Sequence, residues 1–338
     1  MAEGRVISVS KQFQIQMNTY LKLLFRDKKG IIVSLMFPIL ADVVIVWITG
    51  KKMFVDYEGT QPSVFVIVSA AIWAGLFNTA QTMVSIRKNI RRDIDSGLSL
   101  GPYVASRAIV QFFLCALQAI IMTAAFPIAA AVYGNDMLES GLIFGGSIGA
   151  IIEIFISMVL LTYAADLMGL VLSSFIKKAE TGSTLTPYIL IAQLIFSGSL
   201  FEMEGVGKVV SWLMISRWGN ESIGTICGLE NIESRFAIDM STAEINPDSI
   251  SIVPESISID PMTMAVDTSH VEIITKDVEI ITENCEHMAR EGAEKMYGNS
   301  VQHLLITWGV LLIFIVLFII ASRIAINGVK KDDRSSGV

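Results

Sequence analysis

Long apolar stretches separated by short polar segments dominate the pattern of this chain. Six of them are long enough to cross a bilayer as a helix, and they cover residues 30–49, 63–84, 104–132, 141–175, 183–201 and 303–326. A helical crossing takes about 20 residues, so the fourth stretch is too long for one straight span and should bend or protrude from the hydrocarbon. The pattern therefore predicts an all-α polytopic membrane protein with six transmembrane helices.

Residues 1–29 show a different periodicity, in which apolar side chains recur at helical spacing with basic side chains beside them. Phe13, Met17, Tyr20 and Leu24 follow one another every three or four positions. Such a pattern is typical of an amphipathic helix that lies on a membrane surface. We expect this helix on the cytoplasmic side.

Residues 205–208 read GVGK, which resembles the end of a phosphate-binding loop. The complete motif, G-x-x-x-x-G-K-[ST], requires glycine where this chain has Glu202, and Ser or Thr where it has Val209. We therefore expect no nucleotide site there. The glycines instead favour a reversal of the chain, followed by a short amphipathic helix over 206–215 that re-enters the membrane interface with Trp212 at headgroup level.

The segment between the fifth and sixth spans alternates apolar and polar residues. The sequences DSISIVPESISID, beginning at residue 248, and VEIITKDVEIITEN, beginning at 271, alternate as half-buried strands do, and residues 283–299 read as a helix. The sequence predicts a small α+β external domain over residues 220–299.

Charge supports an outward position for this segment. The whole chain carries a net charge of −7, but residues 202–302 alone hold eighteen Asp and Glu against six Lys and Arg. Lys and Arg gather instead near both termini and in the segments after the second and fourth spans. The positive-inside rule then places both termini in the cytoplasm of a cell-membrane protein. An acidic external segment also argues against a nucleic-acid partner.

Two further stretches resemble one protein family. The first stretch, residues 172–223, contains Phe196-Ser197-Gly198 at the end of the fifth span and then Ser216-Arg217-Trp218 within an S-x-R-[WY] type sequence. The second stretch, residues 85–111, contains a basic-acidic run that leads through Gly101-Pro102-Tyr103 into the third span. Both stretches resemble type 2 ABC exporter permeases, close to the G subfamily and its bacterial half-transporter relatives.

The resemblance implies an organisation and a function. The organisation comprises a cytoplasmic connector helix (1–29), spans one to five (30–201) with a coupling helix at 85–97, a re-entrant segment (202–219), the external domain (220–299), a sixth span (300–326) and a cytoplasmic tail (327–338). The implied function is export of an amphipathic or apolar cargo, such as a drug-like molecule, a lipid or a peptide. Implied partners are a separate ATPase subunit, a second permease subunit and the lipid bilayer. The chain itself would be no enzyme and would hold no cofactor, since ATP would bind to the partner.

The resemblance also implies roles for particular residues. The coupling contact with the ATPase would use Arg87, Lys88, Arg91, Arg92 and Asp93, although Ile86 stands where the family often has Glu. The cargo cavity would use Trp73, Phe77, Asn78 and Gln81 of the second span with Leu190, Ile191 and Leu194 of the fifth. The outer gate would use Ser199, Leu200 and Phe201.

Carboxylates within the apolar stretches are costly in lipid, so Asp42, Glu153 and Asp166 need a role. Glu153 and Asp166 stand thirteen residues apart on one helix and cannot touch. We expect interhelical hydrogen bonds or ion pairs, with a coupling-ion site as the alternative. Cys227 and Cys285 both fall in the external segment and could form a disulfide or remain free. The spacing of His and Cys predicts no metal site.

Two rival functions follow from the same residues. A non-transporting sensor or scaffold would use the external domain to bind a ligand, and an ion-coupled carrier would use the three intramembrane carboxylates. Composition alone, with 53% hydrophobic residues, fits all three alternatives.

Overall fold

All regular structure in the described part of the chain is helical. The computed structural model describes residues 8–55, 57–80, 100–134, 141–175, 179–199, 203, 205–230 and 296–335. The helices in these ranges are α1 (Val9–Arg26), α2 (Lys28–Ile48), α3 (Tyr57–Ala80), α5 (Leu100–Tyr133), α6 (Gly146–Phe175), α7 (Ala179–Ile195), α8 (Gly205–Trp212), α9 (Ile215–Ile226) and α11 (Val301–Ser335). The strands expected between residues 231 and 295 lie outside the described residues.

Five of these helices are long and apolar enough to cross a membrane. They are Lys28–Ile48, Gly59–Thr79, Gly101–Tyr133, Gly146–Ser174 and Val301–Ala325. The fifth expected span corresponds to α7, which is 17 residues long and apolar over Thr184–Ile195. The prediction of a helical membrane protein is thus confirmed, while α7 is shorter than the other five.

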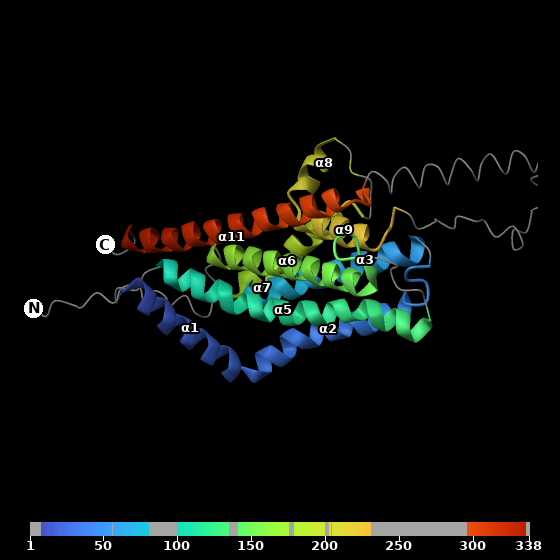
Figure 1. The fold of residues 1–338 in the computed structure, drawn as a ribbon. Coiled ribbons are helices and arrows are strands. Elements are labelled where there is room, and N and C mark those ends of the chain that lie inside the picture. The colour runs from blue at the N-terminus through green and yellow to red at the C-terminus, as the bar shows by residue number, and fades with distance from the viewer. Residues whose placement is uncertain are drawn as a thin grey trace, which may run out of the picture.

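The helices form a bundle with two distinct ends (Figure 1). At one end, which we name the α1 end, α1 meets the beginning of α5, where the rings of Tyr20 and Tyr103 pack edge to face at 5.8 Å. At the opposite end, named the α9 end, Gln61 near the start of α3 donates a hydrogen bond to the carbonyl of Ser199 after α7. The first turn of α1 and the last turn of α11 both lie toward the α1 end.

The packing centre of the bundle is the contact between α3 and α6. Gly75 of α3 lies so close to α6 that a Cβ atom there would stand 2.3 Å from the carbonyl oxygen of Thr162. On α6, a Cβ at Gly169 would stand 2.5 Å from Oγ1 of Thr79. Small residues let the two helix backbones approach closely, which is how membrane helices gain packing energy where lipid supplies no hydrophobic driving force.

The long fourth apolar stretch resolves into a loop and a helix. Helix α6 begins at Gly146, and residues 141–145 before it are not helical. The backbone N–H groups of Leu142, Ile143 and Phe144 all bond to the carboxylate of Glu153, one to two turns into α6. The excess length that we expected to bend or protrude is therefore taken up by a loop that folds back on its own helix.

The segment after α7 forms two short helices at the α9 end. Helix α8 matches the expected amphipathic helix in position, with Val206, Val209 and Leu213 exposed. Helix α9 continues through residue 220, where we expected the external domain to begin, and nearly all of its residues are buried. At the other terminus, α11 extends as a helix to Ser335, so it includes most of the expected cytoplasmic tail.

Candidate functional site

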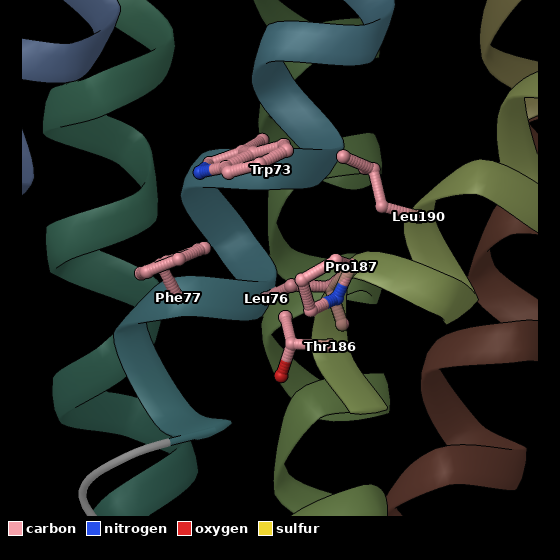
Figure 2. Close-up of a pocket in the computed structure, with 6 residues that line it drawn as sticks. All are labelled: Trp73, Leu76, Phe77, Thr186, Pro187 and Leu190. Atoms are coloured by element: carbon pink, nitrogen blue, oxygen red, sulfur yellow. The ribbon is translucent and has the colours of Figure 1, made fainter. Parts of the chain in front are cut away.

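A small pocket opens between α3 and α7. Its lining is Trp73, Leu76 and Phe77 from α3 with Thr186, Pro187 and Leu190 from α7 (Figure 2). The empty space between these side chains, about 150 Å³, includes open solvent, so the pocket is a narrow surface hollow and not an enclosed cavity. Helical spacing brings residues 73, 76 and 77 to one face of α3, since positions three and four apart are neighbours on a helix. The lining is apolar apart from Thr186, so the pocket suits an apolar group.

Aromatic stacking shapes one wall of this pocket. The rings of Trp73 and Phe77 are stacked, with centroids 5.3 Å apart and planes 8° from parallel. Phe37 of α2 stacks on Trp73 at 5.8 Å. Phe77 remains 42% exposed, so its ring is available to a partner or a ligand. Stacked rings fix one another's orientation and present a flat apolar surface.

Only some of the residues expected to form the cargo cavity line this pocket. Trp73, Phe77 and Leu190 line the pocket. Ile191 is half exposed beside them, while Leu194 packs against the core. Gln81 lies outside the described residues.

Asn78 has a different environment from the one we expected. Ser34 of α2 donates to its Oδ1 at 2.8 Å, and its Nδ2 donates to Oε1 of Gln118 on α5 at 2.9 Å. Gln118 in turn donates to Oγ of Ser34 at 2.8 Å. Asn78 therefore ties α2, α3 and α5 together and does not line the α3–α7 pocket.

Asp166 bridges three helices in the middle of the bundle. Its side chain is fully buried and accepts a hydrogen bond from Nε2 of Gln111 on α5 at 2.9 Å. Its carbonyl accepts from Oγ1 of Thr79 on α3 at 2.6 Å. An interhelical role, which the sequence favoured for the intramembrane carboxylates, is thus confirmed for Asp166.

The other two carboxylates differ from Asp166. Glu153 is also fully buried, but its partners are the backbone N–H groups of the 141–145 loop and not another helix. Asp42 of α2 is 9% exposed, and its Oδ1 has no hydrogen-bond partner among the described residues. Glu153 and Asp166 occupy separate sites, as their spacing predicted.

Arg217 forms the centre of a polar cluster at the α9 end. Its Nε lies 2.7 Å from Oε1 of Glu221 one turn later, and its NH1 donates to Oγ of Ser211 at 3.1 Å. The guanidinium lies 5.8 Å from the ring centres of both Trp212 and Trp218. A cation between two indole rings gains from both ring quadrupoles.

Glu221 completes this cluster. It is 3% exposed, and its Oε2 lies 4.0 Å from Nε2 of His303 at the start of α11. Burial raises the pKa of Glu221 above its ordinary value near 4.5, while Arg217 and His303 lower it in part. The four-residue spacing of Arg217 and Glu221 is visible in the sequence, yet this ion pair was not among the predicted sites.

Hydrogen bonds tie helix α9 directly to α7 and α6. Ser216 donates through its Oγ to the carbonyl of Gln193 on α7 at 2.5 Å. Ser222 shares a 2.8 Å hydrogen bond with Ser157 of α6, whose Oγ also accepts from the indole of Trp308 on α11. These contacts fix α9 as an internal brace at that end of the bundle.

Three predicted sites are not decided by the structure. The coupling residues Arg87, Lys88, Arg91, Arg92 and Asp93 lie outside the described residues, as do Leu200 and Phe201 of the expected gate. Cys227 is buried and has no disulfide partner among the described residues, and burial raises the pKa of its thiol. Since Cys285 lies outside the described residues, its pairing with Cys227 stays a prediction. Among the described residues no cluster of His, Cys, Asp and Glu is arranged to hold a metal ion.

The fold and these contacts define a class: a helical membrane domain. The model of the ABC-2 type transporter family matches residues 11–224, and the chain therefore belongs to that family. This confirms the resemblance found in the sequence.

A curated relative is similar over a comparable length. It is the ABC transporter ATP-binding/permease protein Rv1747 of Mycobacterium tuberculosis, 22% identical over 227 residues. The match covers 63% of this chain but only 25% of the relative. The chain therefore spans about a quarter of that protein, whose name includes both an ATP-binding and a permease function.

Proposed function

We propose that this chain is the permease subunit of an ABC exporter, which moves an amphipathic or apolar cargo outward with energy from ATP hydrolysed on a separate ATPase chain. The observation that carries the proposal is the match to the ABC-2 type transporter family over residues 11–224. The relative named above combines ATP-binding and permease functions by its name, which supports an ATPase as the partner.

The proposed topology has six crossings, by α2, α3, α5, α6, α7 and α11, with both termini in the cytoplasm of the cell membrane. Helix α7 has 17 residues and would rise about 26 Å, slightly less than a hydrocarbon core of about 30 Å. The turn that follows it at 196–199 supplies the remaining length. The position of the first and last helical turns toward the same end of the bundle supports an even number of crossings (Figure 1).

The proposed cargo surface is the α3–α7 pocket with the exposed side chains around it. Phe77, Tyr188 and Ile191 are exposed by 42, 64 and 49% and come from the same two helices. A second permease subunit placed against this face would enclose these side chains in an apolar cavity between the two copies. A flat apolar cargo would then stack on Phe77 and Trp73 (Figure 2).

The test is transport by the chain reconstituted in vesicles with its ATPase, measured with a panel of planar aromatic and aliphatic amphiphiles. We expect nucleotide-dependent transport, and in Phe77→Ala a loss of about fivefold for the planar cargoes, since a stacked ring pair contributes about 1 kcal/mol beyond its buried area. Transport driven by an ion gradient without nucleotide would overturn the proposed function.

The matched control is Phe113→Ala, because Phe113 of α5 is also an exposed aromatic residue, at 63%, and does not line the pocket. We expect this variant to transport every cargo at the wild-type rate. If Phe77→Ala and Phe113→Ala behave alike, the pocket is not the cargo surface.

A further inference from the structure

Arg107 is a buried cation near the α1 end whose hydrogen-bonding capacity is largely unused. It is 4% exposed, and neither its Nε nor its NH1 has a hydrogen-bond partner in the part of the chain that the structure describes. Its guanidinium carbon lies 5.9 Å from the ring centre of Tyr20 on α1. Tyr20 also packs on Tyr103, one turn before Arg107 on α5. Arg107 thus attaches α1 to α5 through a ring face rather than through an ion pair.

A buried anion with a free oxygen lies within electrostatic range of Arg107. Asp166 of α6 is 0% exposed, and its Oδ2 has no hydrogen-bond partner among the described residues. Its other oxygen accepts from Gln111, which stands one turn after Arg107 on α5. Positions four apart share a helix face, so Arg107 stands on the face of α5 from which Gln111 reaches Asp166, while its guanidinium lies over the Tyr20 ring of α1. The charges of Arg107 and Asp166 influence each other without direct contact.

A buried guanidinium and a buried carboxylate that remain incompletely paired are costly, since neither recovers the hydration that it lost. Rotation of the long Arg107 side chain toward α6 would bring the two charged groups closer, because Gln111, one turn later on the same helix, already bonds to Asp166. In this structure the Tyr20 ring holds the guanidinium on the side of α1. The separation of the Arg107 guanidinium from the Asp166 carboxylate therefore depends on the position of α1.

We propose that Arg107 is a positioning residue that exchanges partners during transport, from the Tyr20 ring on α1 in this conformation to the free oxygen of Asp166 on α6 in a second one. The proposal rests on the proposed function, since it describes how movement of α1 reaches the spans. Two discrete arrangements of one side chain are the kind of two-state element through which distant sites become coupled.

A route from Asp166 to the cargo pocket exists in the contacts of α3. The carbonyl of Asp166 accepts from Thr79, and a Cβ on Gly75 would stand 2.9 Å from the backbone nitrogen of Asp166. Helix α3 carries Trp73 and Phe77 within one turn of these contacts. A new ion pair at Asp166 would therefore shift the helix that forms the aromatic wall of the pocket.

The experiment measures cargo transported per ATP hydrolysed by the full chain reconstituted with its ATPase. Arg107→Gln and Asp166→Asn should each lower this ratio about tenfold, within the usual range of allosteric coupling, and the double variant should lower it no further. Arg107→Lys should restore part of the ratio, because Lys keeps the charge. Tyr20→Leu, which removes both the ring and the hydroxyl that contact Arg107, should lower the ratio, whereas Tyr20→Phe, which keeps the ring, should lower it less.

The matched control is Arg323→Gln, which removes an exposed arginine from α11 and should leave the ratio unchanged. If the two single variants reduce the ratio independently, so that their effects multiply in the double variant, Arg107 does not exchange partners as proposed. Should Arg107→Gln fail to fold, as judged by aggregation in detergent, the comparison of Tyr20→Phe with Tyr20→Leu decides, and equal ratios overturn the proposal. Failure of the proposed function looks different: the wild-type complex itself shows no nucleotide-dependent transport.

Discussion

At the scale of single residues, Glu153 and Glu221 show two ways to bury a carboxylate. Glu153 accepts three backbone N–H groups from one loop, at 2.6 to 3.0 Å. Glu221 has one direct partner, Arg217, and a more distant one, His303. Burial disfavours the charge of Glu221 more than these two partners favour it, and the pKa of Glu221 is therefore raised. The ionised form of Glu221 is therefore less favourable in the folded chain than in the unfolded one.

This difference predicts a pH dependence of stability. A carboxyl whose pKa is higher in the folded state holds its proton more tightly there, so the free energy of unfolding falls as pH rises from about 4.5 through the folded-state pKa and then becomes constant. Glu221→Gln removes this titration. We expect the thermal midpoint of the purified wild-type chain in detergent to fall over that range, and the midpoint of Glu221→Gln to fall less steeply.

Other groups titrate in the same range, so the comparison needs a control carboxylate. Asp27 is exposed and caps α2 through a 3.0 Å hydrogen bond from Gly30. Asp27→Asn leaves Glu221 in place, so the fall of the midpoint that Glu221 contributes should remain in this variant. A Glu221→Gln variant with the wild-type slope would contradict the assigned cause.

At the scale of helices, the α3–α6 contact depends on the absence of side chains at Gly75 and Gly169. We expect Gly75→Val to lower stability by about 3 kcal/mol, because the new side chain meets helix backbone, which cannot rotate away. Unfolding monitored by thermal aggregation in detergent measures the change. Gly309→Val in α11 is the matched control, since a Cβ there meets nothing within 4 Å, and equal losses in both variants would contradict the packing argument.

The helices differ in how far the sequence could predict them. Hydropathy located α2, α3, α5, α6 and α11 because each has an unbroken apolar stretch. It missed α9, whose buried positions include Ser216, Asn220 and Glu221. The family resemblance placed Ser216 in a re-entrant segment with re-entrant helices, while Asn220 and Glu221 fell in the expected external domain. Only the partners of Ser216 and Glu221 on other residues reveal why these side chains are buried.

The same limit applies to the candidate sites. The aromatic pair Trp73 and Phe77 was predictable from its spacing of four residues. The role of Asn78 was not, since it depends on Ser34 and Gln118, which lie about 40 residues away on either side in the sequence. In the sequence, Arg107 is one basic residue near the start of the third span, whereas the structure buries it against Tyr20 of α1.

At the scale of the whole molecule, the described residues on either side of residues 231–295 lie next to each other. The carboxylate of Glu230 accepts a hydrogen bond from the backbone of Asn299, so the two attachment points are neighbours. Tyr297 is 1% exposed and packs against Gly224 of α9, where a Cβ would stand 2.5 Å from its ring. Burial raises the pKa of Tyr297, in agreement with this packing. The base of the segment is thus held by the bundle itself.

We therefore expect the bundle to fold without the segment of residues 231–295. A flexible linker of about six residues reaches about 20 Å when extended, which is enough to join two neighbouring points. The variant with this linker should elute from detergent as one species, with a thermal midpoint close to that of the wild type. A second variant, in which the deletion also removes residues 296–299, should be less stable by about 3 kcal/mol, because it loses a fully buried aromatic side chain. If the shorter deletion aggregates as the longer one does, the bundle needs the external segment for its own stability, and the segment is not a separable insertion.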